Sequence, residues 1–299
     1  MLALRSILVM DALDEGAMKA AAGSAADAIL LDLARPSVHG RRDEARRLAR
    51  RHAQAIGKTG RPVLVRVSDA RSGEMAADVE AAVGPWLTGV VVSGAEEPQD
   101  VRDADVLVRK FEMRAQLVPG QVDILPELDS AEGIVALPRL LLAIDRARTV
   151  VLSIDGLRHD LRLGAGAGML YGHAMAEVAL HADAARLPWV VHVQHHRPGV
   201  EHIPTVAHDF GAVGVTVHVE GEARGMNSLF TPDPSEVAIA RAMAAEWERV
   251  RKRGEVIGVV AGEALEAPGY DRLVDRRTVR RARSVLDLVA AIERREAVE

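Results

Sequence analysis

Short apolar runs recur along the chain, and segments with a helical pattern separate them. The runs that we expect to form strands are residues 7–10, 28–33, 63–67, 89–93, 122–129, 149–155, 189–193 and 213–219. The intervening segments that we expect to be helical include residues 41–55, 76–83, 133–143 and 170–186, and a further short apolar element lies at residues 106–108. Apolar strands without polar alternation, each followed by a helix, are typical of a parallel sheet covered on both faces. Eight such units predict an α/β fold, the (β/α)₈ TIM barrel. A doubly wound open sheet is the alternative, which the strand count disfavours.

The pattern changes after residue 219. The elements expected there are a charged amphipathic helix at residues 236–253 with Ser235 as its N-cap, a Gly-containing segment at 256–270 and a final helix at 276–294. We therefore expect the barrel to occupy residues 1–230. Residues 231–299 are expected to form a C-terminal helical lid that packs on the barrel or on a neighbouring subunit.

Composition narrows the class of protein. The chain has 299 residues, of which 48% are hydrophobic and 3% aromatic, so it can bury a large core made of aliphatic side chains. The net charge of −5 argues against a nucleic-acid partner, and the absence of cysteine excludes disulfides and a Cys nucleophile. The first residues resemble a strand rather than a signal peptide, and no apolar run reaches the roughly 18 residues of a membrane span. We expect a cytoplasmic protein with a small-molecule partner and no membrane partner.

Polar residues follow the apolar runs, at the positions where barrel enzymes place their sites. They are Asp11, Asp32, Arg66, Ser93, Glu127, Asp129, Asp155, His192 and His218. This set holds one cation and several carboxylates, without a Cys or a Ser-His-Asp order. A divalent metal with oxygen ligands suits it better than a covalent nucleophile does.

Glu127 and Asp129 are two residues apart, so in a strand both would point to the same face. Two close carboxylates repel, which raises one pKa unless a cation or a shared proton relieves them. Asp129 is thus a candidate metal ligand, with a helix N-cap as its alternative role. Glu127 either replaces a lost metal ligand or bonds Arg66 or Arg158 in the barrel mouth. For Asp155, metal binding competes with an ordinary Asp-Gly turn.

The histidines suggest a second kind of metal site. They cluster at His192, His195, His196, His202 and His208, and such a cluster could bind zinc. Their spacing matches no compact ligand set. His192, at a strand end, is a better candidate for a pocket residue.

Several segments, in a common order and spacing, resemble a known family. They are R-S-I-L-V-M (5–10), A-A-D-A-I-L-L-D-L (25–33), V-R-V-S (65–68), L-D-S-A-E-G (128–133), and G-A-V-G-V-T-V-H-V (211–219) continuing to N-S-L-F-T-P-D-P-S-E-V-A-I-A (227–240). Together they are similar to the HpcH/HpaI aldolase and citrate lyase β-subunit family, of which this chain looks like a divergent member. The resemblance covers nearly the whole chain.

This resemblance implies a fold and a chemistry. It implies a barrel whose C-terminal lid is often lent to a neighbouring subunit, in a homotrimer or hexamer. It also implies Mg²⁺ (or Mn²⁺) held by a Glu and an Asp, a 2-oxo acid gripped by an arginine, and a lid carboxylate that assists a carbon–carbon bond step on a coenzyme A thioester. Coenzyme A would be the substrate carrier.

The implied roles transfer to individual residues of this chain. Arg66 matches the arginine that binds the substrate, and Asp129 matches the metal-binding Glu, one methylene shorter. Glu266 falls on the lid acid, and Asp155 would supply the second metal ligand. The remaining residues that we expect to bind substrate are Ser93, Glu127 and His192.

Four segments depart from the family pattern. Arg158 falls on the second metal-ligand position, where a cation could not bind a metal. The family's D-L-E-D reads D-L-A-R at residues 32–35, so both later acids are lost. A P-K pair becomes Ser93-Gly94, and H-P-x-Q becomes the segment 218–221. These changes put metal binding and catalysis in doubt.

The residues that match the family and the segments that depart from it lead to two possible functions. We expect a magnesium-dependent carbon–carbon lyase, of the aldol or Claisen type, that acts on a β-hydroxyacyl-CoA such as citryl-, malyl- or citramalyl-CoA, or on a related hydroxy-oxo acid. The alternative is a catalytically degenerate family member that serves as a non-catalytic binding or partner subunit.

Overall fold

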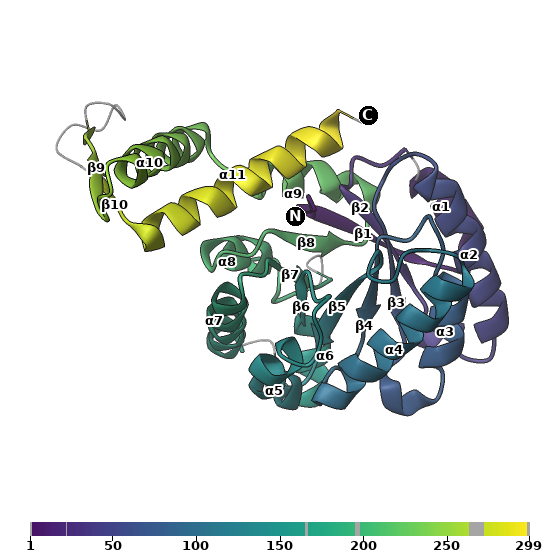
Figure 1. Cartoon of the computed structure of the whole chain (residues 1–299). Helices are drawn as coiled ribbons and strands as arrows, with labels where there is room; N and C mark the ends of the chain where they lie inside the picture. Colours follow the sequence, from purple (N-terminus) through teal and green to yellow (C-terminus); the bar gives the residue numbers. More distant parts are fainter. Residues whose placement is uncertain (1, 22, 165–166, 195–197, 263–271, 298–299) are drawn as a thin grey trace. The chain divides into compact units, whose positions relative to one another are not determined.

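Eight parallel strands close into a barrel (Figure 1). They are β1 Ser6–Asp11, β2 Ala28–Asp32, β3 Val63–Val67, β4 Gly89–Val92, β5 Asp123–Leu128, β6 Val150–Ser153, β7 Trp189–His192 and β8 Gly214–Val217. Each strand pairs in parallel with the next, and β1 pairs with β8 with Ile7 opposite Thr216. This closure confirms the predicted (β/α)₈ barrel and excludes the open doubly wound sheet.

The computed structural model describes residues 2–21, 23–164, 167–194, 198–262 and 272–297. The chain divides into two compact units. One contains residues 4–230, and the other contains the residues from 231 onward together with the N-terminal end.

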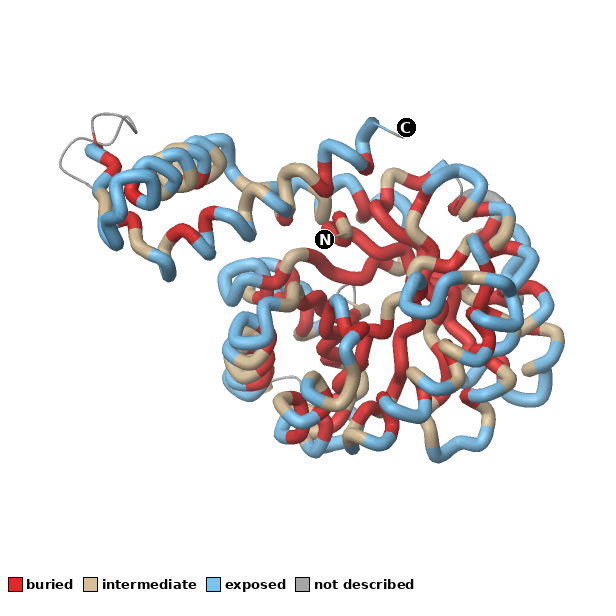
Figure 2. Tube along the Cα trace, in the orientation of Figure 1, coloured by how far each residue is buried: buried red, intermediate tan, exposed pale blue. Residues whose placement is uncertain are grey.

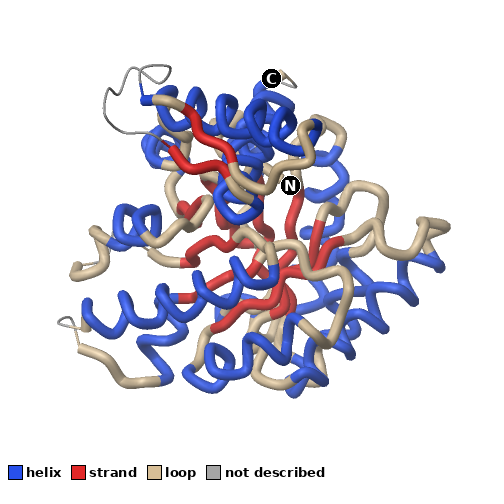
Figure 3. The backbone as a smooth tube through the Cα atoms, turned by 60° about the vertical axis from the view of Figure 1, so that its left-hand side comes forward, coloured by secondary structure: helices blue, strands red, loops and turns tan. Residues whose placement is uncertain are grey.

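Helices and loops enclose the strands of the barrel unit (Figure 3). The helices are α1 Glu15–Ala21, α2 Arg42–Gly57, α3 Met75–Ala82, α4 Pro98–Arg114, α5 Ala131–Leu141, α6 Ile154–Asp160, α7 Gly168–Ala185, α8 Ile203–Asp209 and α9 Ala223–Leu229, with short 3₁₀ turns at Pro36–Val38, Ala70–Ser72 and Glu220–Glu222. Residues 106–108 lie inside α4, so this apolar run is not an element of its own. Among the described residues, no helix combines the length and the apolar character needed to cross a bilayer.

Burial on both faces explains why the strands read as unbroken apolar runs. Every residue of β2, β4, β6, β7 and β8 is buried, and Figure 2 shows the strands as the buried centre of this unit. Their inner side chains fill the barrel, while their outer side chains pack under the helices. Burying so much aliphatic surface is the main force that holds the strands in place. The barrel thereby becomes a rigid frame for the polar residues at its strand ends.

The C-terminal unit contains two long helices and a small hairpin. Its elements are α10 Pro234–Lys252, β9 Gly258–Val260, β10 Arg272–Val274 and α11 Arg276–Glu296, with β9 and β10 antiparallel and α10 packed against α11. The prediction of Ser235 as N-cap was wrong. Asp233 caps α10, and its Oδ1 accepts a hydrogen bond from the Ser235 backbone N–H at 2.8 Å. Pro234 occupies the first helical position, where its fixed φ suits the helix and its missing N–H costs nothing.

Candidate functional site

A buried ion pair joins β3 to β5 near the carboxyl ends of the strands. Arg66 Nε donates to Glu127 Oε2 at 2.5 Å, and Arg66 Nη1 donates to Asp32 Oδ1 at 3.4 Å. The second oxygen of Glu127, Oε1, forms a hydrogen bond with His192 Nδ1 at 2.6 Å. Side chains from β2, β3, β5 and β7 therefore form one connected network, and Glu127 at its centre has no exposed surface.

The network keeps Glu127 ionised. Burial raises the pKa of this carboxyl, but the charge of Arg66 and the hydrogen bond from His192 outweigh burial and lower its pKa to about 2. Burial opposes the charge of Arg66, but the charges of Glu127 and Asp32 outweigh burial and raise the pKa of Arg66. Both Glu127 oxygens are occupied, so Glu127 fits the predicted alternative of bonding Arg66 rather than that of replacing a lost metal ligand.

Asp129 lies one residue beyond the end of β5 and has the opposite electrostatic behaviour. Burial, and after it the negative charge of Glu127, raise its pKa to about 6, with Arg66 acting in the other direction. The predicted alternative role as a helix N-cap was wrong. Ser130 caps α5, and its Oγ accepts a hydrogen bond from the Gly133 backbone N–H at 3.1 Å. Helix capping therefore does not explain why the chain has an aspartate at position 129, where the ionised form is unfavourable.

Asp129 and Arg66 line a common cleft of about 360 Å³, a volume suited to a small molecule. The lining residues are Ala34, Arg42, Arg66, Ser68, Asp69, Arg71, Ser72, Ser93, Gly94, Glu96 and Asp129. The predicted substrate residue Ser93 is among them, and its hydroxyl donates to the Val67 carbonyl at 2.8 Å. The structure thus brings together three of the predicted site residues.

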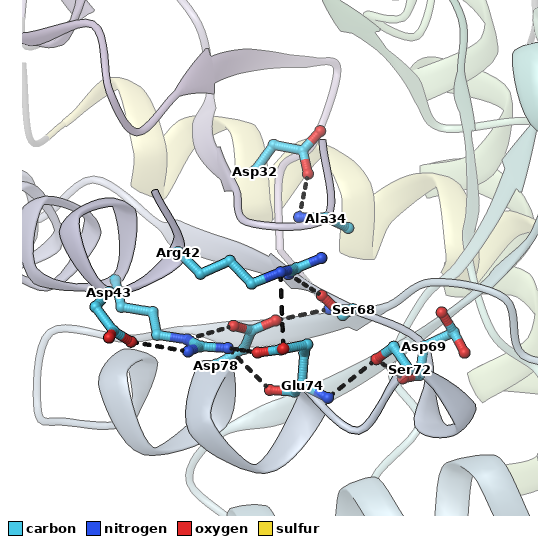
Figure 4. Close-up of polar contacts among 10 residues, drawn as sticks. Asp32, Ala34, Arg42, Asp43, Ser68, Asp69, Ser72, Glu74 and Asp78 are labelled. Carbon is cyan, nitrogen blue, oxygen red and sulfur yellow. Dashed lines mark hydrogen bonds and ion pairs between the residues drawn. The ribbon is translucent and has the colours of Figure 1, made fainter. Parts of the chain in front are cut away.

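Two arginines of the cleft were missed by sequence reasoning. Arg42 is the first residue of α2, and Arg71 belongs to the turn after β3. Figure 4 shows the side chains around Arg42, where Ser68 and Glu74 approach its guanidinium. Neither arginine follows an apolar run directly, so a search of strand ends passes over both.

Asp155 follows β6, the strand paired with β5, and it is not among the residues that line the cleft. It belongs to the first turn of α6, which Ser153 caps, so the predicted alternative of an Asp-Gly turn was wrong. Its Oδ2 accepts a hydrogen bond from the Gln194 backbone N–H at 2.9 Å. A Cβ placed on Gly156 would lie 2.4 Å from Asp129 Cβ, so only glycine permits this close approach of the two segments.

Whether Asp129 and Asp155 hold magnesium depends on how few protein ligands the ion needs. Within the part of the chain that the structure describes, no group of three or more His, Asp or Glu residues could hold a metal ion. Mg²⁺, however, often takes one or two protein carboxylates and fills its other positions with water and substrate. A cation would also relieve the raised pKa of Asp129. Asp129 and Asp155 remain our predicted metal ligands.

Other predicted residues lie outside the cleft or outside the described residues. His192 stacks on His218 with ring centroids 5.9 Å apart and does not line the cleft. Its role in substrate binding stays a prediction. The predicted lid acid Glu266, and His195 and His196 of the possible zinc cluster, lie outside the described residues.

The comparisons with known proteins agree with the resemblance seen in the sequence. The model of the HpcH/HpaI aldolase/citrate lyase family matches residues 5–221. A (3S)-malyl-CoA thioesterase of Cereibacter sphaeroides is 25% identical over 262 residues, which cover 88% of this chain and 89% of the relative.

Solved structures share the fold at lower identity. A citrate lyase from Burkholderia xenovorans superposes with a TM-score of 0.72 at 15% identity, covering 96% of this chain and 92% of the other. The protein CitE from Mycobacterium tuberculosis, in complex with magnesium, acetoacetate and coenzyme A, gives a TM-score of 0.63 at 21% identity and covers 95% and 97% of the two chains.

The depressed pKa of Glu127 predicts how the fold responds to acid. Its folded pKa of about 2 lies below the ordinary 4.5, so its stabilisation is complete above pH 4.5 and is lost as the pH falls toward 2. Glu127→Gln should lower the free energy of unfolding by about 3 kcal/mol at pH 7 and by clearly less at pH 3. Urea denaturation at both pH values measures this, and an equal loss at both would contradict it.

The raised pKa of Asp129 predicts a stabilising substitution. Its folded pKa of about 6 lies above the ordinary 3.8, so the stability it contributes is present below pH 3.8 and is lost as the pH rises through 6. At pH 8, Asp129→Asn should therefore raise the free energy of unfolding by about 1–2 kcal/mol, a range that allows for partial solvent screening. Urea denaturation is again the measurement.

Asp123→Asn is the matched control for this substitution. Asp123 begins β5 at the opposite end of the barrel, and burial raises its pKa as well. It should also stabilise the fold at pH 8 while leaving the cleft unchanged. Destabilisation by Asp129→Asn, beside stabilisation by Asp123→Asn, would refute our account of Asp129.

Proposed function

This chain belongs to the HpcH/HpaI aldolase/citrate lyase family, and on that premise we propose that it cleaves or forms a carbon–carbon bond in a coenzyme A thioester. Its substrate would be a β-hydroxyacyl-CoA of the citryl, malyl or citramalyl type, or a related hydroxy-oxo acid. The observation that carries the proposal is the placing of Arg66 and Asp129 in one small cleft at the barrel mouth.

Arg66 would hold the carboxylate of the acid half. Glu127 and Asp32 fix its guanidinium through Nε and Nη1. The remaining nitrogen, Nη2, makes no hydrogen bond to a described residue, and Arg66 lines the cleft. A guanidinium fixed on one edge presents a planar donor surface to a carboxylate at little entropic cost.

Asp129 and Asp155 would hold magnesium or manganese in our proposal. When bound, such an ion polarises the oxo or hydroxyl oxygen of the acid half and stabilises negative charge there. The CitE protein of the same fold, solved with magnesium, acetoacetate and coenzyme A, supports this choice of cofactor. Asp129 would contribute a carboxylate that burial and Glu127 make unfavourable without a cation.

The reaction in the cleavage direction needs one proton acceptor and one donor. The β-hydroxyl loses its proton, its carbon becomes the carbonyl of an oxo acid, and the electron pair of the broken carbon–carbon bond passes to the α-carbon of the thioester. The enolate that results takes up a proton and leaves as an acyl-CoA. Glu266 is the group that we propose to move this proton, as the lid acid of the resemblance.

Hydrolysis of the thioester is a second candidate. It is favoured by the relative at 25% identity that is named a (3S)-malyl-CoA thioesterase. Water would then add to the thioester carbonyl, the carbon–sulfur bond would break, and the thiol of coenzyme A would leave with a proton from water. A non-catalytic partner subunit is the third possibility, suggested by Arg158 at the expected metal-ligand position. The trimeric or hexameric assembly also stays a prediction, which light scattering would check.

Arg66→Lys tests the proposed role of the cleft. Lysine keeps the positive charge beside Glu127, so the fold should survive, but it cannot offer a planar pair of donors. We expect kcat/KM for the best thioester to fall by about two orders of magnitude or more. Product analysis separates the reactions, because a lyase yields an oxo acid and a shorter acyl-CoA, whereas a thioesterase yields the intact hydroxy acid and free coenzyme A.

Arg114→Lys is the control for this change, because Arg114 pairs with Glu80 on the exposed surface. It should retain wild-type rates. Equal rates for Arg66→Lys and wild type would remove Arg66 from the site. Absence of turnover by the wild type with every thioester would favour the non-catalytic alternative.

Metal binding is tested by calorimetric titration with Mg²⁺ and Mn²⁺, with and without a 2-oxo acid. The wild type should bind the metal more tightly when the oxo acid is present. Asp129→Asn should abolish this binding, because it removes one of only two predicted protein ligands. Asp123→Asn should retain it. Metal binding that survives Asp129→Asn would place the ion elsewhere.

A further inference from the structure

Three arginines and three acids line the cleft, but their charges are not evenly compensated. Arg66 contacts two carboxylates, as described above. Arg71 contacts Glu96 at 2.7 Å and Asp100 at 3.3 Å, and also donates to the Gly94 carbonyl. Both guanidinium ends of Arg71 are therefore engaged, and Arg66 has only its Nη2 left for the one carboxylate that we assign to it.

Arg42 is the exception. Its Nη1 donates to the neutral hydroxyl of Ser68 at 3.1 Å, and its ion pair with a described residue is a long one, 3.9 Å from its Nε to Glu74 Oε1. Glu74 is itself engaged by Arg46, whose hydrogen bond is the main cause of the lowered Glu74 pKa. Arg46 Nε also donates to Asp78 Oδ1 at 2.8 Å, and Figure 4 shows Glu74 and Asp78 below Arg42.

The position of Arg42 in its helix is also unfavourable for a cation. It is the first residue of α2, and no side chain caps that helix end. A cation there opposes the helix dipole, typically at a cost of about 0.3–1 kcal/mol. Its side chain nevertheless remains 26% exposed at the cleft instead of extending away to a better partner.

A third observation comes from Ala34, which lines the same cleft. Ala34 is uncharged, and the next residue is Arg35. Arg35 Nε lies 3.7 Å from Asp32 Oδ2. The loop after β2 therefore adds no negative charge at residues 33–35 to the cleft that Arg42 lines.

We propose that Arg42, with the Ser68 hydroxyl, binds a second anionic oxygen group of the substrate, besides the carboxylate at Arg66. This inference rests on the proposed function and makes it more specific. Two groups carry the required chemistry, namely a second carboxylate of the acid half and a phosphate of coenzyme A. Arg42 and Arg66 share one small cleft, so the second carboxylate is the expected source. The acid half would then be a 2-oxo dicarboxylate, as in a citryl thioester, rather than a monocarboxylate.

The test compares two pairs of stable probes by calorimetry on the full-length protein with Mg²⁺. L-malate and L-lactate differ by one carboxylate, and coenzyme A and its 3′-dephospho form differ by one phosphate. Wild type should bind malate at least tenfold more tightly than lactate. Arg42→Gln should remove most of that preference while leaving lactate affinity unchanged, and Arg42→Lys should restore part of it.

Ala34→Glu tests the same subsite by adding a negative charge to the cleft instead of removing a positive one. It introduces an acid into the cleft that Arg42 lines, so it should also remove the preference for malate. Arg47→Gln is the matched control, because Arg47 is an exposed residue of the same helix. It should leave all four affinities unchanged, and circular dichroism should show that each variant is folded.

The outcomes separate this subsite from the proposed reaction. If Arg42→Gln changes neither the malate preference nor the preference for coenzyme A over its dephospho form, Arg42 does not bind a substrate anion and the inference fails. A loss confined to the coenzyme A pair assigns the anion to the phosphate and overturns the dicarboxylate. An Arg42-dependent malate preference in a protein that turns over no thioester would confirm the subsite and refute the lyase.

Discussion

The buried contact between Arg66 and Glu127 is the constraint on which the rest of the site depends. A carboxylate with no exposed surface is tolerated only when its charge is matched by close donors, because desolvation of a single ion costs several kcal/mol. Glu127 obtains those donors from β3 and β7. The same contact fixes Arg66, which lines the cleft, and the charge of Glu127 adds to burial in raising the pKa of Asp129, while Arg66 opposes both. Glu127 is therefore the anion that holds Arg66 in place. A metal ion at Glu127 would have to compete with Arg66 for the Glu127 oxygens.

Two carboxylates separated by one residue thus have opposite properties. The sequence predicts that they share a face of the strand, but Glu127 lies within β5 and Asp129 lies beyond its end, where strand alternation no longer determines direction. Glu127 meets a guanidinium and an imidazole, whereas Asp129 is half-buried without an equivalent ion pair. Environments that push two neighbouring pKa values apart are a recurring feature of acid–base and metal sites. The spacing of Glu127 and Asp129 in the sequence shows that two carboxylates must lie close together. Only the tertiary contacts show which of them is paired with a cation.

The fold was largely predictable because one physical signal, burial of strands on both faces, repeats eight times. Errors arose where local choices compete. Residues 106–108 are apolar in a strand-like run, yet a long helix with a capping box contains them. Ser235 is a good N-cap by type, but Pro234 shifts the helix start so that Asp233 takes the role. Arg42 could not be identified from the sequence. It is weakly paired only because the nearby acids pair with Arg46 and Arg71, and those pairings depend on the tertiary structure.

The features that are costly to the fold favour an enzyme over an inert barrel. A raised pKa at Asp129 means that its ionised form destabilises the folded state at neutral pH. Arg42 at the start of α2 opposes the helix dipole. A barrel retained for stability alone has no need of these two charges, since an amide at residue 129 and a neutral side chain at residue 42 would remove both costs. Both residues line the same cleft, and a ligand that brings a cation to Asp129 and an anion to Arg42 would compensate both costs at once.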